Sequence, residues 1–208
     1  MTYRLKVVEL NLLPAPEEVL TSKEQAIYQE FKVDKRRHEW YAGRYALKSL
    51  ASDFFTFDMD KMEVRNLPSG KPVLMVPGGT KLPVSITHSG GYAAAAIALT
   101  GENIGIDIEF IERRDKAWAR ECFREEEISS AAPLFLTELW AKKEAVLKFL
   151  GVGLSIDMLD VRFINGRLNL YGKALDIWAK AGSPNIKIDV QDLDGGYKLA
   201  IASEAPLI

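Results

Sequence analysis

The pattern of apolar and polar positions predicts short strands in both halves of the chain. In these stretches apolar side chains recur at every second position or fill the whole run, and turn-forming residues flank them. The predicted strands are residues 3–10, 84–88, 92–99, 103–111, 160–166, 167–172, 186–193 and 197–203.

The alanine-rich run at residues 92–99 is compatible with two structures. Alanine has the highest helix propensity, but a run of small residues also suits a tightly packed strand. The length of the run and the glycine turn at Ser89–Gly91 favour the strand. The "TGEN" segment, residues 100–103, is then the turn of a hairpin that pairs this strand with residues 103–111.

Longer stretches with helical periodicity lie between the predicted strands. They are residues 16–31, 34–54, about 115–129 and 133–150. Because both halves combine long helices with antiparallel strands, we expect an α+β fold of two similar, pseudo-symmetric lobes, each a small antiparallel sheet packed with helices. The expected lobes are residues 1–103 and 104–208.

The composition is that of an ordinary globular protein, with 48% hydrophobic and 27% charged residues among 208. The formal net charge of −2 and the lack of a basic run predict no binding to nucleic acid. The single cysteine, Cys122, cannot form an internal disulfide, which fits the cytoplasm. No run of 18 apolar residues exists, and the N-terminus lacks the apolar core of a signal peptide, so we expect no association with a membrane.

The stretch "IGIDIEF", residues 104–110, places two carboxylates on one face of a predicted strand. Side chains two residues apart point to the same side, so Asp107 and Glu109 project together beside Gly105, which leaves room next to them. Two such ligands suit Mg²⁺, which completes its octahedron with phosphate and water. The spacing is common, however, and taken alone it favours a half-exposed strand with solvated acids.

The stretch "WAKKEAVLKFLGVGL", residues 140–154, predicts an amphipathic helix. Trp140, Glu144 and Lys148 recur at every fourth position on one face, opposite an apolar stripe. A third carboxylate and a cation on this face would complete a metal site and hold a phosphate. The local alternative is a surface ion pair that stabilises the helix by about 0.2–0.5 kcal/mol, and the stretch taken alone favours that alternative.

His88, in "ITHSGG", lies at a predicted strand end beside a glycine turn, where side-chain and backbone N–H groups can donate to a phosphate. A lone turn histidine more often has no ligand. The chain has no G-x-S-x-G elbow, too few Cys and His residues for a zinc site, and no G-x-x-x-x-G-K-[ST] or G-x-G-x-x-G loop. The acidic neighbours of Cys122 in "RECFREEE" argue against a reactive thiolate.

The order of these motifs is more specific than any one of them. "KRRHEWYAGRYALK", "GKP", "SITHSGG", "IGIDIE", "CFREEE" and "WAKKEAVLK" follow one another over residues 35–148. The set resembles the Sfp-type 4′-phosphopantetheinyl transferases, above all in the pairing of "GIDIE" with "WAKKEAVLK" at this separation. The resemblance covers most of the chain, and it implies two similar α+β lobes that bind coenzyme A in the cleft between them.

The resemblance also implies roles for individual residues. Asp107, Glu109 and Glu144 are the expected ligands of Mg²⁺, or of Mn²⁺, so the second lobe carries most of the metal site. Glu144 is the first choice for the base that takes the serine proton, with Glu127 or a metal-bound water as alternatives. The expected contacts to the phosphates and nucleotide of coenzyme A are Arg44, Lys71, Pro72, His88, Ser89, Lys148 and, with less support, Arg37. His88 and Lys148 are also expected to assist the transfer.

The implied reaction moves the 4′-phosphopantetheine group of coenzyme A to a serine hydroxyl of an acyl or peptidyl carrier protein and releases adenosine 3′,5′-bisphosphate. Lys142 and Lys143 are the expected contacts to an acidic carrier, and the chain length favours a monomer. Two alternatives stay open. One is an inactive relative that binds coenzyme A or a carrier without transfer, and the other is an α+β interaction module whose motifs are accidental.

Overall fold

The computed structural model describes residues 2–99 and 103–205, apart from the side chain of Leu154. The first half contains the strands and helices β1 (Tyr3–Glu9), α1 (Pro16–Val19), α2 (Ser22–Glu30), α3 (Asp34–Phe55), β2 (Glu63–Asn66), β3 (Pro72–Met75), β4 (Lys81–Ser89) and β5 (Tyr92–Ala98). The second half contains β6 (Ile104–Phe110), α4 (Lys116–Cys122), α5 (Pro133–Phe149), β7 (Val161–Ile164), β8 (Arg167–Leu170), α6 (Gly172–Lys180), β9 (Ile186–Leu193) and β10 (Tyr197–Glu204). Within these described ranges, no helix is long and apolar enough to cross a membrane.

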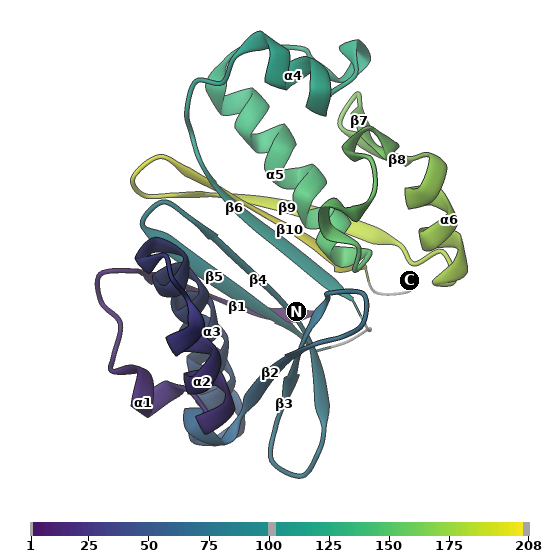
Figure 1. The fold of residues 1–208 in the computed structure, drawn as a ribbon. Helices are drawn as coiled ribbons and strands as arrows, with labels where there is room; N and C mark the ends of the chain where they lie inside the picture. The colour runs from purple at the N-terminus through teal and green to yellow at the C-terminus, as the bar shows by residue number, and fades with distance from the viewer. Residues whose placement is uncertain (1, 100–102, 206–208) are drawn as a thin grey trace.

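Two antiparallel sheets form the centre of the molecule, and a long helix covers the outer face of each (Figure 1). The first sheet, in the order β1-β5-β4-β3-β2, packs against α3, and the second, in the order β6-β10-β9, packs against α5. The inner faces of the two sheets pack on each other through small and branched side chains, among them Ala94, Ala96, Ile106 and Ile108. The predicted α+β class with two similar lobes is confirmed.

The alanine-rich run is a strand, as predicted, but the predicted hairpin with residues 103–111 is wrong. Strand β5 pairs with β4 and β1, whereas β6 pairs with β10 in the other sheet. Small side chains on both faces of β5 allow α3 to pack on one side and the second sheet on the other. Most of the predicted "TGEN" turn lies outside the described residues, and the predicted lobe boundary at residues 103 and 104 stays a prediction.

The predicted helices are mostly confirmed, with two interruptions. The stretch at residues 16–31 forms two helices, because Leu20 and Thr21 are extended and the Thr21 side chain caps α2 by accepting from the amide of Glu24. The stretch at about 115–129 forms α4 and a separate 3₁₀ turn, Glu125–Glu127. Strands β2 and β3 and helix α6 were not predicted.

The first lobe is held together by a buried ion pair. The ammonium of Lys48, on α3, pairs with the carboxylate of Glu24 and donates to the carbonyl oxygen of Val19 at 2.8 Å. The same carboxylate accepts from the backbone amide of Val64, on β2, at 3.0 Å. A long helix, a short helix and a strand thus meet at one pair of charges.

The second lobe repeats this arrangement. The ammonium of Lys143, on α5, pairs with Glu127 at 2.9 Å and donates to the carbonyl oxygen of Cys122 at 2.8 Å. Glu127 accepts from the backbone amide of Phe163, on β7, at 3.0 Å. The same donors and acceptors on corresponding elements support the pseudo-symmetry of the lobes, and the hydrogen bonds that each charged group makes beyond the ion pair allow both charge pairs to remain buried.

Helix α5 lies directly on β6, and a glycine allows this close approach. A Cβ atom at Gly105 would overlap the carbonyl oxygen of Ala145 and the amide nitrogen of Phe149 on α5. Backbone atoms in a packed helix cannot move aside as a flexible side chain can. The contact therefore requires glycine at this position, and it brings the polar face of α5 over the carboxylates of β6.

We expect Gly105→Ala to lower the free energy of unfolding by about 1–3 kcal/mol or more, the usual cost of forcing an extra carbon into a packed interface. Urea denaturation measures this change. Gly91→Ala is a matched control, because its added Cβ would meet only the Tyr197 hydroxyl at 3.9 Å. Equal stability of Gly105→Ala and wild-type protein would contradict the close approach.

Candidate active site

Three carboxylates and an ammonium meet where α5 crosses β6. Asp107 and Glu109 lie on the face of β6 that is turned toward α5, and Glu144 and Lys148 lie one turn apart on α5. Asp107 and Glu144 are only 4% and 7% exposed. The ammonium of Lys148 donates to Oδ1 of Asp107 at 2.7 Å. The structure therefore brings together four side chains that the sequence placed on two separate elements.

Burial raises the pKa values of all three carboxylates, and repulsion by Asp107 adds to the rise at Glu109 and Glu144. Burial raises the pKa of Asp107, while the nearby Lys148 acts in the opposite direction. Burial and then the charge of Asp107 raise the pKa of Glu109, and the same two causes raise the pKa of Glu144 to about 7. The three carboxylates outnumber the two cations beside them, Lys148 and Arg114, and a divalent cation would favour the ionised form of all three.

The carboxylate of Asp107 has one oxygen with two donors and one oxygen with none. Oδ1 accepts from the hydroxyl of Thr87 at 3.0 Å and from Lys148, whereas Oδ2 is buried without a hydrogen-bond partner in the described part of the chain. Such buried oxygens usually find a donor or an ion. An anionic oxygen of this kind is the ligand that Mg²⁺ prefers.

The donor set fits Mg²⁺ in its chemistry, but it is not a preassembled metal cage. Across residues 2–99 and 103–205, no group of three or more His, Cys, Asp or Glu side chains is arranged to hold a metal ion. Mg²⁺ generally takes only one or two protein carboxylates and completes its shell with water and substrate phosphates. The metal site therefore stays a prediction, with Asp107, Glu109 and Glu144 as the residues that would hold the ion.

Glu109 is held by two side chains whose role the sequence analysis did not identify. The indole N–H of Trp140 donates to Oε1 of Glu109 at 2.8 Å, and the guanidinium of Arg114 lies 3.3 Å from Oε2. Arg114 in turn stacks over the ring of Trp118, which packs against Trp140 at 5.3 Å between ring centroids. Only the recurrence of Trp140 on the same helix face as Glu144 was visible in the sequence.

Glu127 lies outside this cluster, although the family resemblance placed an acidic residue near the site here. The side chains of Glu127 and Lys143 are both 0% exposed and pair with each other. Glu127 therefore cannot reach a serine hydroxyl, and the prediction that Lys143 contacts a carrier is wrong. Lys142 remains partly exposed and pairs with Glu138.

Burial raises the pKa of the Cys122 thiol to about 11, in line with the predicted lack of reactivity.

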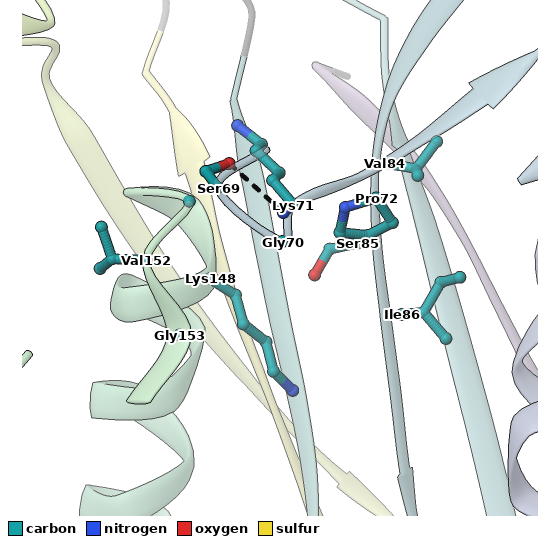
Figure 2. A pocket seen from close by; sticks show the side chains of 11 residues that line it. Ser69, Gly70, Lys71, Pro72, Val84, Ser85, Ile86, Lys148, Val152 and Gly153 are labelled. Carbon is teal, nitrogen blue, oxygen red and sulfur yellow. Dashed lines mark hydrogen bonds between the residues drawn. The ribbon is translucent and has the colours of Figure 1, made fainter. Parts of the chain in front are cut away.

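Two adjoining cavities extend from Lys148 along the first lobe. The first, about 270 Å³, lies between the β2–β3 turn, β4 and the end of α5, and Figure 2 shows Lys148 opposite Pro72 and the turn that carries Lys71. The second, about 530 Å³, lies between α3 and the first sheet. Because Pro72 and Ile86 line both cavities, we treat the two as one cleft.

Most of the predicted binding residues line this cleft. They are Arg44, Lys71, Pro72, His88 and Lys148. Arg37 lies outside it, because its guanidinium pairs with Asp34 and stacks over Tyr28. Its neighbour Arg36, which the sequence analysis did not single out, lines the second cavity. The hydroxyl of Ser89 accepts from the amide of Phe110 at 3.2 Å and contributes to neither cavity wall.

The second cavity combines cations with one carboxylate. Burial lowers the pKa of His88, and the nearest carboxylate, Glu39, lies 3.9 Å from its Nδ1 atom. Burial likewise lowers the pKa of Arg44 to about 10, while its guanidinium stacks 3.3 Å from the centroid of the Trp40 ring. Arg44 is therefore a desolvated cation that interacts strongly with an incoming phosphate, whereas the lowered pKa of His88 favours its neutral form, which can still donate one hydrogen bond.

The raised pKa of Glu144 predicts a pH-dependent stability of the metal-free protein. Its pKa rises from 4.5 to about 7, so the stability linked to its protonation is complete below pH 4.5 and is lost as the pH rises through about 7. Between pH 5 and pH 8, Glu144 should lower the free energy of unfolding of wild-type protein by up to about 3 kcal/mol. We expect Glu144→Gln to lack this part of the decrease, because glutamine does not titrate. Urea denaturation in the presence of EDTA measures both proteins. If the free energy of unfolding depended on pH in the same way in both proteins, the raised pKa of Glu144 would be contradicted.

Comparison with known proteins identifies the family. Residues 103–202 match the 4′-phosphopantetheinyl transferase superfamily, and residues 23–98 match the 4′-phosphopantetheinyl transferase N-terminal domain. The 4′-phosphopantetheinyl transferase psf-1 of Bacillus pumilus is 26% identical over 184 residues, which cover 85% of this chain and 74% of the relative. The holo-[acyl-carrier-protein] synthase of Exiguobacterium sibiricum is 38% identical over 90 residues, covering 39% of this chain and 67% of that protein.

Among solved structures, a holo-(acyl-carrier-protein) synthase from Bacillus anthracis in complex with CoA superposes with a TM-score of 0.40 and 29% identity, covering 46% of this chain and 92% of that one. The two sequence matches to family models lie in succession along the chain, one in each lobe. The chain therefore belongs to the 4′-phosphopantetheinyl transferase superfamily of enzymes.

Proposed function

We propose that the protein transfers the 4′-phosphopantetheine group of coenzyme A to a serine hydroxyl of an acyl or peptidyl carrier protein, in a reaction that depends on Mg²⁺. The observation that carries the proposal is the meeting of three carboxylates and Lys148 at one end of a cleft lined by cations. The monomeric state and the cytoplasmic location stay predictions.

The cleft suits a long ligand with several phosphates. Arg36, Arg44 and His88 line the second cavity, and Lys71 and Lys148 line the first. Coenzyme A carries a pyrophosphate and a separate 3′-phosphate, so the arginines and lysines along the cleft can neutralise both anionic groups at once, and His88 can donate a hydrogen bond to one of them. Lys148 belongs both to the cleft and to the carboxylate cluster, and it therefore places the pyrophosphate beside the carboxylates.

In the proposed reaction the serine oxygen forms a bond to the phosphorus that bears the pantetheine arm, and the bond from this phosphorus to the bridging oxygen of adenosine 3′,5′-bisphosphate breaks. Mg²⁺, when bound, neutralises charge on the pyrophosphate oxygens. Lys148 adds positive charge beside the same oxygens. Glu144 takes the serine proton, since a bound cation would favour its ionised form, which is the form that accepts a proton.

Mass spectrometry of an apo acyl carrier protein, incubated with this protein, coenzyme A and Mg²⁺, tests the function. We expect the carrier to gain the phosphopantetheine mass, and we expect Asp107→Ala or EDTA to abolish the gain, because both remove the charge balance at the pyrophosphate. Thermal stabilisation by coenzyme A is measured alongside. Stabilisation without transfer to any carrier would favour an inactive relative, and neither stabilisation nor transfer would refute the proposed function.

The neighbouring arginines at the start of α3 provide a test of the cleft itself. We expect Arg36→Ala to raise the KM for coenzyme A several-fold, because Arg36 lines the second cavity. Arg37→Ala is the matched control, and we expect a KM near the wild-type value since its guanidinium faces Asp34 and Tyr28. Steady-state kinetics with varied coenzyme A measures the KM of both variants. A larger rise in KM for Arg37→Ala than for Arg36→Ala would contradict the proposed position of coenzyme A in the cleft.

A further inference from the structure

The face of β4 that is turned toward the second sheet carries a row of hydroxyl groups. Their oxygens accept hydrogen bonds from three backbone amides of β6: Ser85 from Ile106 at 3.0 Å, Thr87 from Ile108 at 3.2 Å and Ser89 from Phe110 at 3.2 Å. Within the described ranges β6 is the edge strand of its sheet, so these amides have no neighbouring strand there as a partner. The hydroxyls satisfy them and join the two lobes.

Thr87 makes a second contact that connects this row to the carboxylate cluster. Its hydroxyl oxygen accepts a hydrogen bond from the backbone amide of Ile108. Its single proton is donated to Oδ1 of Asp107 at 3.0 Å. The residue is only 4% exposed, so little water can compete for either bond. The backbone of β6 fixes the hydroxyl oxygen, and the hydroxyl in turn fixes the carboxylate of Asp107.

We propose that Thr87 is a positioning residue for the cation of this enzyme. Thr87 and Lys148 both donate to Oδ1 of Asp107, and this arrangement leaves the buried Oδ2 free to bind the ion. Without the Thr87 hydroxyl, the carboxylate can turn about its side-chain bond, and Lys148 can pair with either oxygen. The inference rests on the proposed function, since the cation is part of that proposal.

The test compares three variants of buried threonines. Thr87→Val keeps the shape of the side chain and removes the hydroxyl, and Thr87→Ser keeps the hydroxyl. Thr137→Val is the matched control, because Thr137 is 1% exposed and its hydroxyl has no hydrogen-bond partner among the described residues. Binding of Mn²⁺ is measured by electron paramagnetic resonance with coenzyme A present and no carrier protein, so that no turnover occurs. The Mg²⁺ concentration for half-maximal transfer is measured separately.

We expect Thr87→Val to weaken Mn²⁺ binding about 10–100-fold, the usual effect of losing a side chain that orients a metal ligand. It should raise the Mg²⁺ requirement for transfer in parallel, while Thr87→Ser and Thr137→Val stay near wild type. Should Thr87→Val fail to fold, Thr87→Ala removes the same hydroxyl without adding atoms and gives the same comparison.

Unchanged Mn²⁺ binding by a folded Thr87→Val or Thr87→Ala protein would overturn the role of Thr87 and leave the proposed function intact. If Thr87→Val and Thr87→Ser lost the same amount of affinity for Mn²⁺, the role of the Thr87 hydroxyl would also be overturned, because the serine variant keeps this group. Wild-type protein that binds no Mn²⁺ in the presence of coenzyme A would overturn the proposed metal site and this role together.

Discussion

The site depends on how closely α5 lies on β6. Because a Cβ at Gly105 would overlap the backbone of α5, the helix occupies the space that a side chain would fill elsewhere. Glu144 and Lys148 then reach the face of β6 that carries Asp107 and Glu109. The opposite face of β6 packs against the first sheet, so one seven-residue strand carries the carboxylates and part of the contact between the lobes.

The two kinds of buried charge in the protein have opposite consequences. The pairs Glu24–Lys48 and Glu127–Lys143 are balanced, and both partners make further hydrogen bonds to the backbone, so each pair holds its lobe together. The carboxylate cluster is unbalanced, and its raised pKa values reflect the energy of crowding negative charge away from water. Strain of this kind at one place in a well-packed fold is typical of a functional site.

The sequence predicted the faces of single elements better than the contacts between them. Alternation in "IGIDIEF" placed Asp107 with Glu109, and the four-residue spacing placed Glu144 with Lys148, because both periods follow from backbone geometry. Periodicity does not reveal which element covers a face. The partner of β5, the burial of Lys143, the place of Arg36 instead of Arg37, and the contacts of Thr87 and Trp140 all depend on elements that are distant in the sequence.

In the proposed enzyme the carboxylates beneath α5 hold a divalent cation beside the pyrophosphate of coenzyme A. The most direct test is anomalous diffraction from crystals grown with coenzyme A and Mn²⁺. We expect a single strong anomalous peak among Asp107, Glu109 and Glu144, with the pyrophosphate next to it and the rest of coenzyme A along the cleft. A well-ordered coenzyme A with no metal at these carboxylates, or a metal bound elsewhere, would contradict it.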